Sequence, residues 1–255
     1  MEQLMNYPML ICLITFACLW AAARFGTFLR ERIDRGAAAL PEDFGTVLSA
    51  TLTLLGLLVG FSFSMAISRY DVRKDYEEEE ANAIGTEYLR ADLLADAARA
   101  KVKQQLVRYL DLRIKKYESH ASEDATQLGM DTTRLQNEMW NEVSIVAATR
   151  TDPVMNSVVT GMNDVINRQG YTQAARWNRI PLPAWGLMAA IALFCNFLIG
   201  YGEKVPGANR KLLLIVPLAI AVSFLLIADI DSPQGGLIRV APQNLISLAD
   251  SLKAQ

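Results

Sequence analysis

The sequence has few of the residues that most often carry catalysis or bind metals. It contains one histidine, His120, and three cysteines, Cys12, Cys18 and Cys195. All three cysteines lie in apolar segments, where they suit buried packing better than a disulfide framework or a zinc site. The histidine lies alone in a polar segment. We therefore expect no metal site and no other cofactor.

Recognisable catalytic motifs are also missing. The chain has no GxSxG nucleophile motif, no HExxH zinc motif and no phosphate-binding loop, and His120 has no obvious acidic partner. Its net charge is −2, so it has no basic excess that would attract nucleic acid. We expect neither an enzyme nor a nucleic-acid-binding protein.

What the sequence does have is long apolar segments. It is 52% hydrophobic over 255 residues, and the apolar residues are gathered in blocks. A helix needs about 20 apolar residues to cross a bilayer. Four blocks meet this need, at residues 8–25, 44–68, 182–201 and 212–228. The first is expected to be a retained span and not a cleaved signal, because an acidic residue and no basic one precedes it.

Between the second and third blocks lies a polar segment, residues 69–180, whose apolar residues recur at helical spacing. Residues 119–130 are expected to form a loop, after which Asp131 would cap a helix. The Asp152-Pro153 pair is typical of a further helix start, and Gly170 of its end. The predicted fold class is all-α, an integral membrane protein with four transmembrane helices and a helical domain inserted between the second and third.

This pattern predicts four regions along the chain. They are a first transmembrane hairpin at 1–68, a soluble helical domain at 69–180, a second hairpin at 181–228 and a C-terminal tail at 229–255. Basic residues flank the membrane about equally on both sides, so the positive-inside rule leaves the orientation open.

The second block combines small, hydroxyl-bearing and large apolar residues. Gly56 and Gly60 form a GxxxG motif, which most often allows two helices to approach closely. The alternative is a pore wall, in which small residues leave room and large apolar ones form a constriction. The pore-lining candidates are Ser49, Thr53, Gly56, Leu57, Gly60, Phe61, Phe63 and Ser64.

Acidic residues follow the second block and end the fourth. Four consecutive glutamates, Glu77 to Glu80, cannot all face one partner on a helix, and a solvated face is the simpler interpretation. In a symmetric oligomer, Glu80 and Glu87 would form acidic rings that attract cations. Asp229 and Asp231 are expected to be solvated, to pair with arginines near the membrane, or to help bind a cation.

Two longer stretches carry a family resemblance. LLGLLVGFSFSMAISRYDVRKDYEEEEANAIGTEYLRADLL and ADIDSPQGGLIRVAPQNLISL resemble a family of bacterial membrane proteins described as bestrophin-like. The marks are the EAN at residues 80–82, the YLR at 88–90 and the DSPxGG that begins at Asp231. More distantly, the architecture resembles the bestrophins, which are homopentameric ion channels.

The resemblance implies a homo-oligomer, with a pentamer favoured, in the bacterial inner membrane. Its partners would be the lipid bilayer, other copies of the chain and permeating ions. It also implies that the 69–180 domain is cytosolic and that a hydrophobic neck includes Leu57, Phe61, Phe63 and Met65. Animal bestrophins carry an acid-rich calcium clasp after the fourth span, where this chain has only Asp229 and Asp231.

Two alternative functions, of different classes, are therefore expected. The first is an ion channel in which the second span lines the pore and the acidic helix extends it. The second is a non-conducting membrane sensor or scaffold whose helical domain binds a ligand or partner. The absence of an output domain after the fourth span disfavours signalling by this chain alone.

Overall fold

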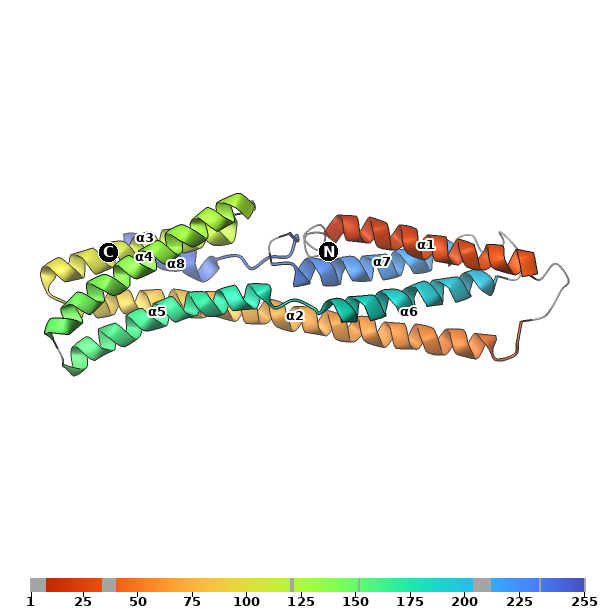
Figure 1. Cartoon of the computed structure of the whole chain (residues 1–255), viewed down its shortest axis with the longest axis horizontal. Coiled ribbons are helices and arrows are strands. Elements are labelled where there is room, and N and C mark those ends of the chain that lie inside the picture. The colour runs from red at the N-terminus through yellow and green to blue at the C-terminus, as the bar shows by residue number, and fades with distance from the viewer. Residues whose placement is uncertain are drawn as a thin grey trace. The chain divides into compact units, whose positions relative to one another are not determined.

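The computed structural model describes residues 8–33, 40–119, 122–150, 152–203, 212–233 and 235–254, and these form helices joined by short turns, without strands. His120 lies outside them. The all-α prediction is confirmed. In chain order (Figure 1) the helices are α1 (Pro8–Ile33), α2 (Phe44–Arg90), the short 3-10 helix η2 (Ala91–Leu93), α3 (Asp96–Glu118), α4 (Ser122–Thr149), α5 (Pro153–Trp177), α6 (Leu182–Tyr201), α7 (Leu212–Asp231) and α8 (Gln243–Lys253).

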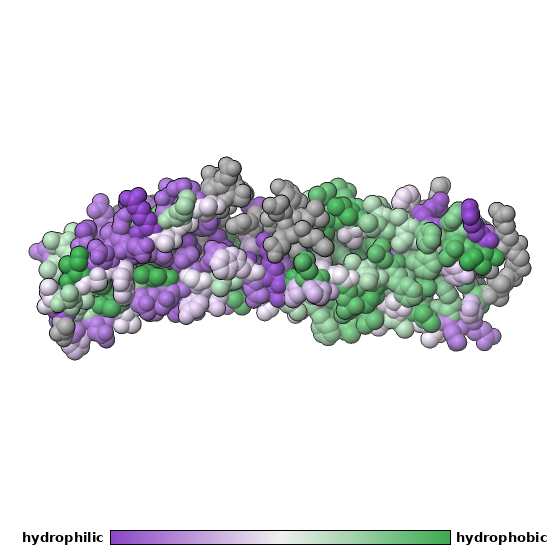
Figure 2. Space-filling model, viewed as in Figure 1, coloured by the Kyte–Doolittle hydropathy of each residue, from purple (hydrophilic) through white to green (hydrophobic). Residues whose placement is uncertain are grey.

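The chain divides into two compact units. The membrane unit comprises Met1–Arg69 and Arg179–Arg239, and the helical unit comprises Tyr70–Asn178 and Val240–Gln255. Hydrophobic residues cover the helices of the membrane unit, whereas hydrophilic residues dominate the surface of the helical unit (Figure 2). The segment after the fourth span is shared: its turn belongs to the membrane unit and α8 to the helical unit.

Four stretches of helix are long and apolar enough to cross a membrane, and they coincide with the four predicted blocks. The third span, α6, has the predicted bounds 182–201. The first is longer than predicted, because α1 runs to Ile33. The fourth, α7, continues past 228 to Asp231, so Asp229 lies within its last turn. The second is part of α2, which continues without a break to Arg90.

Two helix boundaries in the helical unit differ from the sequence prediction. The expected loop at 119–130 is mostly helix, since α4 begins at Ser122 and Asp131 lies inside it. No proline interrupts this segment, and the one glycine, Gly129, costs a helix only about 1 kcal/mol. Gly170 does not end α5, which continues to Trp177. The stop lies closer to Pro181, which disfavours helical geometry in the residue before it.

The helical unit has a continuous apolar core. Tyr109 from α3, Met139 from α4 and Met162 from α5 are fully buried in it, together with Leu245 from α8. The predicted cap of α5 is confirmed, because the Asp152 carboxylate accepts a 2.9 Å hydrogen bond from the Met155 backbone N–H.

In the membrane unit, α1 and α6 approach so closely that only glycine fits at two positions. A Cβ atom on Gly200 would overlap the carbonyl oxygen of Ala23. One on Gly26 would lie 2.7 Å from the backbone nitrogen of Tyr201 and overlap the carbonyl oxygen of Phe197. Small residues let membrane helices make backbone contact in this way. No GxxxG spacing marks these glycines in the sequence.

Replacing Gly200 should therefore weaken the membrane unit. Gly200→Ala forces backbone against backbone, and we expect a loss of about 1–3 kcal/mol, seen as a lower melting temperature in detergent. Gly186→Ala is the matched control, since it lies on the same helix and no atom of a neighbouring described segment lies within 4 Å of its added Cβ. Equal melting temperatures for the two variants would contradict this packing.

Candidate functional site

The eight pore-lining candidates all lie on the exposed surface of α2. Ser49, Thr53, Gly56, Leu57, Gly60, Phe61, Phe63 and Ser64 are exposed in the protomer. Among the large apolar candidates, Leu57 and Phe61 are the most exposed, with 53% and 63% of their surfaces accessible. The opposite face is packed, because Leu55, Ser62 and Ala66 are buried and recur at helical spacing. The candidates therefore share the side of α2 that faces away from its own bundle.

The GxxxG motif at Gly56 and Gly60 makes no close contact within the protomer. No atom of the described residues lies within 4 Å of a Cβ added at either position. Close packing inside the chain, the more common use of this motif, is thus not its use here. The hydroxyl of Thr53 donates to the carbonyl of Ser49 at 2.9 Å, so its donor is satisfied by its own helix.

Glu80, one of the two acidic-ring candidates, is fully buried inside the helical unit. Its two carboxylate oxygens accept hydrogen bonds from the Arg113 guanidinium of α3, one of them at 3.2 Å. The Thr172 hydroxyl of α5 donates to the same carboxylate at 3.2 Å. A ring around a pore needs carboxylates that face the pathway. The structure instead uses Glu80 to hold three helices of one protomer together.

The groups around Glu80 respond to its charge. Burial alone lowers the pKa of Arg113, but the adjacent Glu80 more than offsets this and the pKa is raised. Burial raises the pKa of Tyr117 to about 12, and Glu80 adds to the shift. Arg176 stacks over the Tyr117 ring at 4.5 Å from its centroid. The cluster is therefore a fixed ion pair with aromatic neighbours.

Glu87, the other ring candidate, is also fully buried, so it is no more available to a pore than Glu80. Neither of its carboxylate oxygens has a hydrogen-bond partner among the described residues. The nearest charge is the Arg90 guanidinium, at 3.9 Å. Burial, the largest cause, raises the pKa of Glu87 to about 8.

A third glutamate, Glu77, has a role that the sequence did not indicate. It is buried, and its carboxylate accepts 3.0 Å hydrogen bonds from the backbone N–H groups of Asn244 and Leu245 at the start of α8. The Asn244 side chain adds a third bond at 2.7 Å. The carboxylate accepts hydrogen bonds from N–H groups that have no partner within α8, and the positive end of the helix dipole stabilises its negative charge. No local signal links two residues so far apart.

The two aspartates at the end of α7 are buried and not solvated. Asp229 accepts 2.8 Å hydrogen bonds from the N–H groups of Leu237 and Ile238, which fixes the turn after the span. Gly236 is required there, because an added Cβ would lie 2.5 Å from the Asp229 carbonyl oxygen. Asp231 accepts from Ile180 N–H at 3.0 Å and lies 3.8 Å from Arg69. The expected pairing with an arginine is thus found for Asp231.

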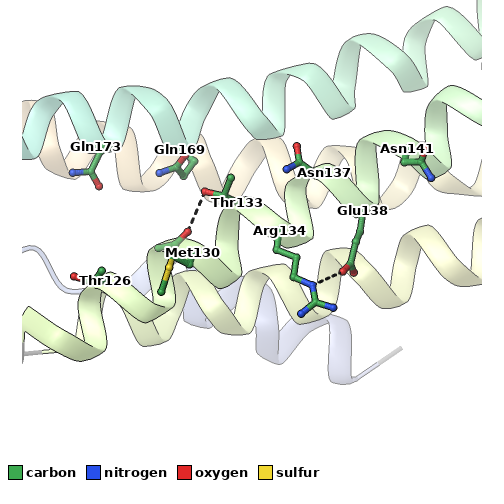
Figure 3. Close-up of a pocket in the computed structure, with 10 residues that line it drawn as sticks. Thr126, Met130, Thr133, Arg134, Asn137, Glu138, Asn141, Gln169 and Gln173 are labelled. Atoms are coloured by element: carbon green, nitrogen blue, oxygen red, sulfur yellow. Dashed lines mark hydrogen bonds and ion pairs between the residues drawn. The ribbon is translucent and has the colours of Figure 1, made fainter.

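Described residues of the helical unit line at least two open cavities. The larger, about 870 Å³, lies between α4 and α5 and is lined mainly by amide and hydroxyl side chains. Gln169 and Gln173 of α5 face Thr133 and Asn137 of α4 across it (Figure 3). Its charged lining residues, Arg134 and Glu138, pair with each other. The smaller cavity, about 360 Å³, is lined by Glu79, Asn82, Ala83, Thr86, Arg90, Gly161, Asp164 and Arg168.

The described part of the chain holds no group of three or more histidine, cysteine, aspartate or glutamate side chains arranged to bind a metal ion. Asp229 and Asp231 instead use their oxygens on backbone N–H groups. The chemistry available is thus that of a membrane protein with buried ion pairs and an exposed face on α2.

Comparison with known proteins agrees with this architecture. The sequence pattern of the Bestrophin-like domain matches residues 11–245. The chain belongs to the bestrophin-like family. A search of curated protein sequences finds no significant match.

Solved structures with the same fold include bacterial bestrophin homologues. One from Klebsiella pneumoniae, carrying a single substitution, superposes with a TM-score of 0.65 at 14% identity, over 95% of this chain and 94% of that one. Another from the same organism gives 0.64 at 14% identity, over 93% and 98%. The shared fold and the four candidate spans confirm the four-span prediction, and the match to the family pattern confirms the recognition of the family.

The burial of Glu80 leads to a stability prediction. Glu80→Gln leaves the Arg113 charge buried without its anion, and breaking such a pair costs about 3–5 kcal/mol. We expect a large fall in the melting temperature. The double variant Glu80→Gln, Arg113→Met should recover part of the loss, because no unpaired charge remains.

Glu78→Gln is the matched control, since Glu78 is an exposed neighbour on the same helix. If Glu80→Gln and Glu78→Gln melted at the same temperature, the buried pair would not support the fold as described.

Proposed function

We propose that the protein is a homo-oligomeric ion channel in which the α2 span lines the pathway. One observation carries this proposal: every pore-lining candidate lies on the face of α2 that its own bundle leaves uncovered. Within a membrane that face must meet lipid, another subunit or water. Membership of the bestrophin-like family favours a symmetric assembly with these faces around a central axis.

The residue types along the face suit a pathway of varying width. Gly56, Gly60 and Ser64 leave room, and hydroxyl groups offer oxygen atoms to a passing ion. Leu57 and Phe61 are large, apolar and exposed, so around an axis they would form a hydrophobic constriction that gates by excluding water. Phe63 and Met65 extend the same neck.

The pathway proposal does not include Glu80 and Glu87. Both are enclosed by the helices of their own protomer. The acidic helix therefore supports the pore-lining span through packing and ion pairs, instead of contributing rings of charge. By family membership we propose a pentamer in the bacterial inner membrane, with the helical unit in the cytosol.

A second function is favoured by one observation. The open cavity between α4 and α5 has neutral hydrogen-bonding groups from both helices. Such a surface suits a polar, uncharged ligand or a partner protein, as a membrane sensor or scaffold requires. In that case the exposed face of α2 would line no ion pathway. A measurement of ion flux across liposomes separates the two functions.

The channel proposal predicts ion flux across liposomes that contain the purified protein. Phe61→Ala should raise the flux several-fold by removing the constriction. Gly56→Phe should lower it, because no described atom lies within 4 Å of an added Cβ there and the ring would extend from the open face into the pathway. Phe194→Ala is the matched control, an exposed phenylalanine on α6.

Three results would contradict the channel. They are no flux from wild-type protein, equal flux from Phe61→Ala and Phe194→Ala, or a purified particle that is a monomer or dimer with no axial path.

The cytosolic placement of the helical unit predicts which side of the membrane an introduced cysteine reaches. Ser247→Cys on α8, in a chain whose native cysteines are replaced, should react with an impermeant maleimide only after cells are opened. Arg32→Cys, at the end of α1, provides a second labelling position, which lies on the membrane unit. Labelling of Ser247→Cys in intact cells would place the helical unit outside.

A further inference from the structure

We propose that Glu87 is a proton-binding site, and that the protonated carboxyl group is what allows α2 to pack tightly against α5. The site lies wholly within the helical unit. It goes beyond the channel proposal and does not depend on ion conduction.

The surroundings of Glu87 suit a neutral carboxyl group better than a charged one. Its side chain is fully buried, and no described group donates a hydrogen bond to either oxygen. A buried carboxylate without donors loses its hydration and gains nothing in return, so it favours taking up a proton. Glu77 and Glu80 show the contrast, because each accepts several hydrogen bonds.

The packing around Glu87 is too tight to admit a solvation shell. It lies against Gly161 of α5, and a Cβ atom on that glycine would lie 3.0 Å from the Glu87 carboxyl carbon and overlap its Oε2 atom. Oε2 and the Arg90 guanidinium both come close to this glycine position. Gly161 is therefore the residue that makes space for the Glu87 carboxyl group.

The smaller cavity gives protons a route to this group. Gly161 and Arg90, which both lie beside the Glu87 carboxyl group, line the cavity. The cavity is open to solvent and mainly polar. The carboxyl group thus lies just beneath the wall of a water-accessible space, where it can exchange a proton without unfolding.

Two charged groups act on Glu87 from the helices that enclose it. Arg90 on α2 favours the ionised form, and Asp164 on α5 disfavours it, while burial outweighs both. The other charges that line the cavity, Glu79 and Arg168, pair with each other. The resulting pKa of about 8 agrees with a proton bound at neutral pH.

The sign of the pH effect follows from linkage. The ordinary pKa of the group is 4.5, and in the folded protein it is about 8. The folded state therefore holds a proton that the unfolded state releases between these values. The contribution of Glu87 to stability is complete below about pH 4.5, declines up to about pH 8 and is lost above it.

The direct test is infrared spectroscopy of the full-length protein, from about two units below to about two units above pH 8. A protonated carboxyl group gives a carbonyl stretch distinct from that of a carboxylate. We expect this band in wild-type protein at the low end, its loss at the high end, and its absence from Glu87→Gln throughout. Glu78→Gln is the control and should keep the band.

The melting temperature gives a second readout. Glu87→Gln should be more stable than wild type above pH 8, where wild type carries the unfavourable charge, and nearly equal to it near pH 5. The wild-type spectrum alone decides the matter if the variant does not fold. A wild-type band that is absent, or that Glu87→Gln retains, would overturn the proposal.

Two further variants test the direction in which each neighbouring charge shifts the pKa of Glu87. Asp164→Asn removes a like charge and should shift the titration of the band to lower pH, whereas Arg90→Gln should shift it to higher pH, each by roughly 0.5 pH unit. Shifts in the reverse directions would mean that a different carboxyl group gives the band.

Discussion

A carboxylate removed from water must find hydrogen-bond donors or give up its charge, and the helical unit depends on how α2 meets this constraint. Glu77 binds the free N–H groups at the start of α8. Glu80 pairs with Arg113 and Thr172. Glu87 has no donor among the residues that the structure describes, and it lies against Gly161. Three acids on one helix face thus connect α2 to α8, to α3 and to α5, so the acidic segment organises the bundle.

The membrane unit is organised by a different rule. Without water there is no hydrophobic drive between helices, so close approach of backbones matters most. Gly26 and Gly200 provide it between α1 and α6. Gly56 and Gly60 of α2 lie on an open face instead. Glycine therefore allows close packing between α1 and α6 within the protomer, whereas on the second span it leaves an open surface.

The spans and the all-helical class could be predicted because apolar length and helical spacing are local properties. Asp152-Pro153 was a reliable start signal for the same reason. The boundaries at residues 119–130 and at Gly170 were wrong because composition only shifts probabilities, and a helix that buries an apolar face tolerates glycine and polar residues.

The candidate site was predictable only in part. Helical spacing placed the α2 candidates on one side of the helix, and the structure leaves that side exposed. It could not tell which glutamates are buried, because burial depends on what packs against the helix. Arg113 and Gly161 lie far from Glu80 and Glu87 in the sequence, and neither stands out by type. Glu77 and its partner Asn244 are separated by 167 positions.

That last separation has a consequence for biosynthesis. Glu77, whose carboxylate accepts from the first N–H groups of α8, is synthesised before the third and fourth spans. The α8 segment is synthesised after both. Until the ribosome has delivered α8, the Glu77 carboxylate lacks the three donors that Asn244 and Leu245 supply. The completion of the helical unit by α8 therefore follows the synthesis of both spans of the second hairpin.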